Sequence, residues 1–225
     1  MGASVYEAVA AEYYDAALHP TCANFRDLTI TLFRAWADEL QAPVVELGAG
    51  RSSLPDLGRT APERAVLVDS SPAMLAGNDP AALRMVGDAR HLPLRTGVVG
   101  SVVAAMADPF NDSALWAECA RVGRPGAVVL FSTPSHGWAR RYRASVGDPV
   151  DRARFATAAG SVLTPSYVLT VDEQVALMEA HGLRVTDVEA AGTVALPTGT
   201  PVSPKLAELL STGEPAVTAF RAEVR

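Results

Sequence analysis

The sequence predicts a single α/β domain with a doubly wound, mostly parallel seven-stranded sheet, helices on both faces and an antiparallel edge strand. The length of 225 residues, with 49% hydrophobic and 20% charged residues, is ordinary for one such domain. Short and nearly continuous apolar runs recur along the chain, as in strands that are buried on both faces. Helical patterns alternate with these runs, and the C-terminal end is rich in strands.

The N-terminal part, residues 1–42, is expected to form a helical cap. It reads as two helices over 5–18 and 21–40, which are split at His19-Pro20. In the second helix, apolar residues recur at spacings of three and four and form one face. They are Phe25, Leu28, Leu32, Phe33, Trp36 and Leu40.

The strands come next, and most of them lie in a cofactor-binding core over residues 43–132. We predict strands over 43–47, 65–69, 83–88, 100–106, 126–132, 183–190 and 216–224. A helix over 172–182 ends at Gly182, so residues 171–225 should supply a C-terminal helix and strands.

Residues 133–170 fit no simple element. They contain Trp138, Tyr142, Phe155 and Tyr167 in a chain that is only 6% aromatic. An insertion of this length inside a compact domain is typical of a lid. We therefore predict that the segment covers a substrate.

Charge and cysteine content exclude several classes of function. The net charge of −6 and the single lysine, Lys205, argue against a nucleic-acid partner. Cys22 and Cys119 follow no metal spacing, so we expect no metal and two reduced thiols in the cytoplasm. The N-terminus lacks a signal-peptide pattern, and the longest apolar run, 98–107, is about half a membrane span. No membrane association is expected.

The stretch VVELGAGRSS, residues 44–53, predicts a strand that runs into a tight glycine turn. A phosphate-binding P-loop would need a Gly-Lys-Ser/Thr sequence downstream, and no lysine lies there. The dinucleotide pattern G-x-G-x-x-G/A matches only in part, because Ser53 stands at its third position. A nucleoside that is bound without phosphates is the third alternative.

Two acids follow at the ends of the next predicted strands. Asp69 lies 21 residues after Gly48, where a carboxylate can accept both hydroxyl groups of a ribose. Asp88 comes another 19 residues later and could accept a hydrogen bond from an adenine amino group. Ligands of open α/β sheets bind at these carboxyl ends. Asp69 alone would also suit NAD.

With these residues the chain resembles the class I S-adenosylmethionine-dependent methyltransferases that act on small molecules. Residues 46–50 resemble the first motif of the family, 66–69 with 71–75 the second, and 87–89 with 92–94 the third. Residues 118–134 resemble the helix, turn and strand that close the core. Residues 5–15 resemble an N-terminal helix whose tyrosines cover the methionine end of the cofactor. The resemblance implies a Rossmann-like methyltransferase fold with S-adenosylmethionine as cofactor.

The resemblance also implies a set of site residues. Asp69 would hold the ribose, Asp88 the adenine, and Glu46 the ammonium group of the cofactor. Met74 and Met106 would flank the purine, although plain core packing is the alternative. The full set of expected cofactor-binding residues is Tyr6, Tyr14, Glu46, Gly48, Ala49, Gly50, Asp69, Ser70, Met74, Asp88, Ala89 and Met106.

The expected activity is in-line methyl transfer to a small-molecule acceptor. Two candidates for a general base are His136, at the start of the insertion, and His19, beside the N-terminal tyrosines; a surface position is the alternative for His19. The segment MADPFND, residues 106–112, departs from the usual catalytic signatures. The alternative is therefore an S-adenosylmethionine-binding protein of this fold with non-methylating catalysis or a binding or regulatory role. Acidic charge disfavours an RNA methyltransferase.

Overall fold

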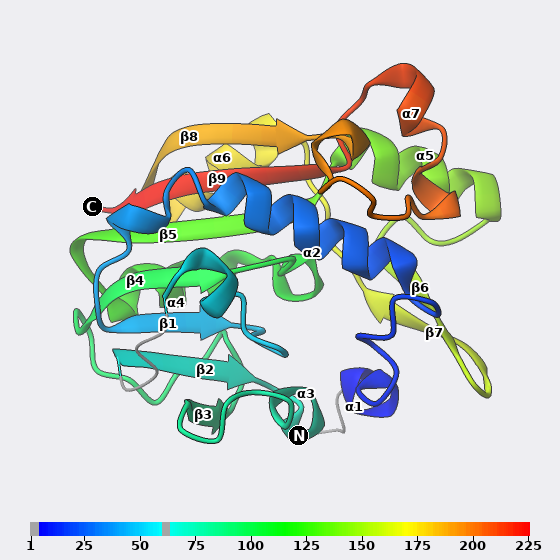
Figure 1. The fold of residues 1–225 in the computed structure, drawn as a ribbon. Coiled ribbons are helices and arrows are strands. Elements are labelled where there is room, and N and C mark those ends of the chain that lie inside the picture. The colour runs from blue at the N-terminus through cyan, green and yellow to red at the C-terminus, as the bar shows by residue number, and fades with distance from the viewer. Residues whose placement is uncertain (1–4, 60–63) are drawn as a thin grey trace.

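The computed structural model describes residues 5–59 and 64–225 (Figure 1). Its main sheet has seven strands in the order β3-β2-β1-β4-β5-β9-β8. Their bounds are β1 Val44–Leu47, β2 Ala65–Asp69, β3 Leu83–Val86, β4 Val99–Ala104, β5 Gly123–Pro134, β8 Leu183–Ala191 and β9 Val217–Val224.

The predicted fold class is confirmed. The five strands from β3 to β5 pair in parallel, whereas β9 runs antiparallel to both β5 and β8. The antiparallel strand thus lies one place in from the edge. Because β1, β2 and β4 are parallel neighbours, their carboxyl ends meet at one edge of the sheet.

Helices cover both faces of the sheet. In Figure 1, α2 lies in front of the strands, and α4 and α6 lie behind them. The α-helices are α1 Val5–Val9, α2 Pro20–Phe33, α3 Pro72–Leu75, α4 Ser113–Val122, α5 His136–Val146, α6 Val171–Ala180 and α7 Leu209–Thr212. The 3-10 helices are η1 Ala37–Glu39, η2 Pro55–Leu57, η4 Asp108–Phe110, η5 Thr193–Ala195 and η6 Pro204–Leu206.

The N-terminal helices are shorter than the sequence indicates. Helix α1 ends at Val9, and the amides of Glu12 and Tyr13 donate to the Val9 carbonyl in tight turns. Helix α2 ends at Phe33, and η1 completes the remainder of the predicted segment. The turns after Val9 redirect the chain so that Tyr13 and Tyr14 reach the carboxyl edge of the sheet.

Residues 133–170 are ordered elements rather than an irregular loop. They comprise the end of β5, helix α5 and a hairpin of β6 (Arg152–Thr157) with β7 (Gly160–Pro165). The hairpin is a separate two-stranded sheet.

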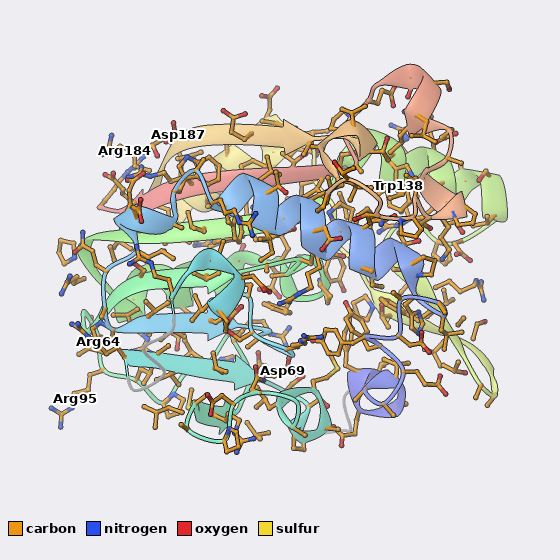
Figure 2. All side chains as sticks on the ribbon, in the orientation of Figure 1. Arg64, Asp69, Arg95, Trp138, Arg184 and Asp187 are labelled. Atoms are coloured by element: carbon orange, nitrogen blue, oxygen red, sulfur yellow. The ribbon has the colours of Figure 1, made fainter. Side chains whose placement is uncertain are left out.

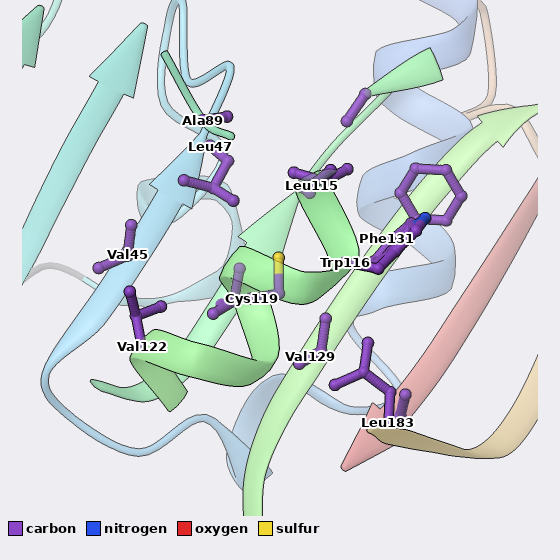
Figure 3. Close-up of a cluster of buried hydrophobic side chains, with 14 of the residues drawn as sticks. Val45, Leu47, Ala89, Leu115, Trp116, Cys119, Val122, Val129, Phe131 and Leu183 are labelled. Atoms are coloured by element: carbon purple, nitrogen blue, oxygen red, sulfur yellow. The ribbon is translucent and has the colours of Figure 1, made fainter. Parts of the chain in front are cut away.

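The core is built from the continuous apolar runs that predicted the strands. On one face, α4 packs Trp116, Cys119 and Val122 against β1 and β5 (Figure 3). The rings of Trp116 and Phe131 meet edge to face, with centroids 4.9 Å apart. On the other face, Phe33 of α2 joins Leu67 and Leu130 in a second buried cluster. Burial on both faces leaves the carboxyl edge as the place for polar ligand-binding groups.

Candidate active site

A cavity of about 1050 Å³ opens at the carboxyl ends of β1, β2 and β4, bordered by α1 and α2. Small-molecule pockets usually measure ~300–1,000 Å³, so this space can hold a nucleoside and a second small molecule. Among the predicted cofactor-binding residues, Tyr6, Tyr14, Glu46, Gly48, Ala49, Asp69, Ser70, Met74, Asp88, Ala89 and Met106 line it. Gly50 does not line the cavity, but it donates its amide to a residue that does.

The turn after β1 requires glycine at two positions. Gly48 and Gly50 have φ angles of +60° and +42°, in the left-handed region that other residues rarely adopt. A Cβ on Gly48 would lie 2.7 Å from the Phe110 ring, and one on Gly50 would collide with the Tyr14 hydroxyl. Any larger residue would therefore displace Phe110 or Tyr14, both of which line the cavity.

Asp69, the last residue of β2, holds this turn in place. It is 8% exposed, and its Oδ2 and Oδ1 accept the amides of Gly50 and Ser71, each at 2.9 Å. Burial raises the pKa of the carboxyl, and the backbone amides oppose that rise. The backbone amide of Ser70 is a further donor to this carboxylate, which has roughly four acceptor sites, so acceptor capacity is left for one ligand hydroxyl. A ribose hydroxyl matches this arrangement.

Glu46 lies deeper, at the end of β1, and is 1% exposed. Its carboxylate accepts the Ser53 amide at 2.7 Å, the Ser53 hydroxyl at 2.6 Å and the Ser52 hydroxyl. Burial raises the pKa of the carboxyl, and the two serines oppose that rise. A buried carboxylate of this kind is stabilised by a nearby positive charge. In the sequence, Ser53 stood out only as a departure from the dinucleotide pattern, so the role of both serines as donors was missed.

Asp88 lines the cavity but is already engaged by a partner that the sequence analysis missed. Arg90 donates Nε to its Oδ1 and Nη2 to its Oδ2, both at 2.9 Å. The Arg90 guanidinium lowers the pKa of this carboxyl. Asp88 is therefore a fixed anion at the end of β3, and an adenine amino group would have to share it with Arg90.

Aromatic rings form the far end of the cavity. Tyr6, Tyr13, His19 and Phe155 contact one another, with ring centroids between 5.7 and 6.2 Å apart. His19 is 6% exposed, its Nε2 has no hydrogen-bond partner in the structure, and burial lowers its pKa. Of the two predicted candidate bases, His19 is thus the one that reaches the cavity.

His136 does not line the cavity. It is the first residue of α5, whose inward face carries the buried Trp138 and Arg143. Trp138 packs against Phe25 and Tyr142, with centroids 5.1 and 5.4 Å away, and its Nε1 donates to the Lys205 carbonyl at 3.0 Å. Figure 2 shows Trp138 well apart from Asp69.

None of the four aromatic residues of the insertion lines the cavity, so their expected place in a pocket is wrong. Trp138 and Tyr142 pack in a core beneath η6 because α5 is amphipathic, and Tyr167 is 38% exposed outside the cavity. Phe155 does not line the cavity either, but the hairpin brings it against Tyr6, Tyr13 and His19, which do.

The segment after β4 anchors the insertion. The Ser166 hydroxyl donates to Asp108 Oδ2, and the Tyr167 amide donates to the Asp108 carbonyl at 2.9 Å. Arg143, 7% exposed, donates to the Ser166 carbonyl at 3.2 Å and to the Ser166 hydroxyl. Asn111 donates to the Tyr167 carbonyl at 3.0 Å. The polar groups of residues 106–112 are thus used to hold the insertion in place.

This anchor predicts a specific dependence of stability on pH. Burial raises the pKa of Asp108 to about 6, despite the Ser166 hydroxyl and the Arg143 charge. Because the ordinary pKa is ~3.9, the folded chain binds more protons than the unfolded chain between these values. The free energy of unfolding should therefore fall by about 2–3 kcal/mol, relative to Asp108→Asn, as pH rises from ~4 to ~7.

Chemical denaturation of both proteins across this range measures the difference. Asp187→Asn, which removes a carboxylate at an exposed position on β8, is the control for loss of a charge. If the free energy of unfolding changed with pH in the same way in the wild type and in Asp108→Asn, Asp108 would not be a buried acid with a raised pKa.

Two further properties concern the described residues as a group. Over residues 5–59 and 64–225, no three His, Cys, Asp or Glu side chains are grouped so that they could hold a metal ion. Within the same ranges no helix has the length and apolar character that crossing a bilayer requires.

The fold matches that of known methyltransferases. A candidate methyltransferase from Haloferax volcanii, solved with the Trm112 methyltransferase activator, matches with a TM-score of 0.67 and 16% identity over 98% of both chains. An S-adenosylmethionine-dependent methyltransferase from Mesorhizobium loti matches with a TM-score of 0.61 and 19% identity, over 85% of this chain and 95% of that one.

A third match has a bound ligand pair. It is the 1,6-didemethyltoxoflavin-N1-methyltransferase from Burkholderia thailandensis with its substrate and S-adenosylhomocysteine, with a TM-score of 0.56 and 15% identity over 95% and 84% of the chains. No family model and no curated protein sequence matches the chain. At these identities the comparisons establish the fold, which is the Rossmann-like fold of class I S-adenosylmethionine-dependent methyltransferases.

Proposed function

We propose that the protein is an S-adenosylmethionine-dependent methyltransferase that transfers the methyl group in line to a small-molecule acceptor. The observation that carries this proposal is the pair of buried carboxylates, Asp69 and Glu46, on either side of the glycine turn. The fold and the volume of the cavity support it.

The residues present fit the cofactor. Asp69 keeps acceptor capacity for a ribose hydroxyl beside the backbone amides that it binds, and Glu46 presents a buried negative charge suited to the cofactor's ammonium group. Met74 and Met106 line the same space and offer apolar surface to a purine. When bound, the cofactor supplies an electrophilic methyl group on a sulfonium ion. The protein supplies orientation and a pocket that excludes water, which can contribute ~7–11 kcal/mol to rate acceleration.

We assign the acceptor to the far end of the cavity, beyond β4, where the aromatic rings lie. His19 is the proposed general base there, because burial lowers its pKa and so favours the neutral ring, and because it borders the cavity. The acidic net charge supports a small molecule over a nucleic acid as acceptor. The two free cysteines support a cytoplasmic location.

A labelled-methyl assay tests the proposal. Purified protein, incubated with methyl-labelled S-adenosylmethionine and a small-molecule fraction of a cell extract, should move label into an organic product. Gly50→Val, which collides with Tyr14, is the inactive control. Binding of the cofactor with no labelled product from any extract would instead favour a protein that binds S-adenosylmethionine without methylating.

A further inference from the structure

The two halves of the cavity differ in charge. Around the glycine turn and the ends of β1 to β3, the lining includes Glu46, Asp69, Asp88 and Arg90. Beyond β4 the described lining residues are Ala105, Met106, Pro109, Phe110, Pro165 and Pro197, and none is charged. The charged groups that act on His19, namely Glu12, Lys205 and Asp15, lie outside the lining. A charged acceptor placed beyond β4 would lose its hydration without direct contact with a partner of opposite charge in the lining. The acceptor half therefore favours an uncharged molecule.

Tyr6, Tyr13 and His19 complete the lining of that half, and Phe155 packs against their rings from outside the lining. The Tyr13 and Phe155 rings stack at 5.7 Å, and the Tyr6 ring meets Phe155 edge to face at 5.9 Å. The hydroxyls of Tyr6 and Tyr13 are engaged with Thr164 and Cys22. The rings are thus fixed by their polar ends, and their faces are suited to another flat ring.

His19 supplies a polar atom that lacks a partner. Its Nε2 is buried and has no hydrogen-bond partner, and the rings of Tyr13 and Phe155 lie 6.2 and 6.0 Å from its own. In the tautomer that carries the proton on Nδ1, Nε2 is a buried acceptor without a donor, which is costly, so a ligand that brings a donor there is favoured. His19 is among the residues that line the cavity, so a ligand there can approach its ring.

We infer that the acceptor is an uncharged aromatic hydroxyl compound whose O–H group donates to His19 Nε2. This inference rests on the function proposed above. An aromatic hydroxyl must lose its proton to become a strong nucleophile, whereas an amine needs no base, so a buried basic nitrogen selects the hydroxyl.

The proton and electrons balance in one step. His19 Nε2 takes the hydroxyl proton, and the bonding pair of the O–H bond stays on oxygen. The oxygen forms a bond to the methyl carbon as the carbon–sulfur bond breaks, and that pair stays on sulfur as a neutral thioether. His19 then releases the proton to water.

Binding of model compounds tests the inference without a turnover assay. The probes are 2-naphthol, 2-methoxynaphthalene, which lacks the O–H group, and the anion 2-naphthoate. Each is titrated into the protein with saturating S-adenosylhomocysteine. We expect 2-naphthol to bind about tenfold tighter than either of the others, because only it is uncharged and satisfies His19.

Variants assign the preference to a residue. In His19→Phe the ratio between 2-naphthol and 2-methoxynaphthalene should fall to within about twofold. His19→Gln should retain the ratio, because its amide oxygen still accepts a hydrogen bond. This variant controls for a loss of the preference that is caused by poor folding. His136→Phe, outside the cavity, should leave it unchanged. An unchanged ratio in His19→Phe, or equally tight binding of 2-naphthoate, overturns the inference alone. Failure of S-adenosylhomocysteine to bind the wild type overturns the proposed function as well.

Discussion

Replacing Asp69 with asparagine should weaken S-adenosylhomocysteine binding by roughly 10- to 150-fold, because an ionised acceptor of hydroxyl groups contributes ~1.5–3 kcal/mol. Asparagine keeps one acceptor oxygen for a backbone amide, so it disturbs the glycine turn less than alanine would. Alanine would leave the amides of Gly50 and Ser71 without their acceptor. A loss of affinity in that variant could then come from a disturbed turn as well as from the lost ligand contact. Isothermal calorimetry on the asparagine variant gives the dissociation constant.

The matched control is Asp187→Asn, at the opposite end of the sheet from Asp69 (Figure 2). It removes the same charge and should leave the affinity within about twofold, since exposed charges beyond a Debye length are screened. A dissociation constant in Asp69→Asn equal to that of the wild type would place the ribose elsewhere in the cavity.

Replacing Trp138 with alanine should destabilise the fold by about 3–5 kcal/mol, the usual cost of emptying a large buried aromatic site. The ring fills the space between Phe25 and Tyr142. Loss of its indole N–H would leave the Lys205 carbonyl without a donor. Affinity for S-adenosylhomocysteine should not change in the folded protein, because Trp138 lies outside the cavity. Chemical denaturation measures the stability.

Tyr167→Ala is the comparison within the same insertion. Its ring is 38% exposed, and its structural contacts are made by the backbone, so the expected loss is about 1 kcal/mol or less. If Trp138→Ala kept its stability and lost ligand affinity, the ring would belong to the site after all.

The strands were predictable because a sheet buried on both faces needs continuous apolar runs. Val44–Leu47 and Val99–Ala104 are buried throughout, and the sequence shows each as an apolar stretch. The acids Glu46 and Asp69 follow from the same logic, since a carboxylate at the end of such a run has only the carboxyl edge of the sheet to face. Where the crossovers are short, as with η2 and α3, the sequence carries no helical period to detect.

The partners of the site acids were not predictable from spacing. Ser52 and Ser53 serve Glu46 only because the turn after Gly50 folds back over β1, and Arg90 reaches Asp88 through a local turn. The polar residues of 106–112 resembled a degraded catalytic signature. Asp108 and Asn111 in fact bind Ser166 and Tyr167, about 56 to 58 residues away in sequence, a relation that only the folded chain shows.

The aromatic content of the insertion could not show which of its aromatic residues line the cavity and which pack in the core. Trp138 and Tyr142 lie on one face of a helix that also presents Arg143 inward, so that face packs against the domain. Phe155 lies on a strand of the hairpin and contacts the N-terminal tyrosines instead. The distinction depends on the length of α5 and on where the hairpin folds.

The most direct test of the account is calorimetry of the wild-type protein with S-adenosylhomocysteine and with NAD. Both carry the ribose that Asp69 would accept, but they differ in the pyrophosphate. Glu46 is a buried anion beside the glycine turn, and Ser53 occupies the third position where dinucleotide folds have glycine or alanine. We therefore expect one molecule of S-adenosylhomocysteine to bind per chain, with no measurable heat from NAD. Tight binding of NAD with none of S-adenosylhomocysteine would contradict the proposed cofactor and the methyl transfer that depends on it.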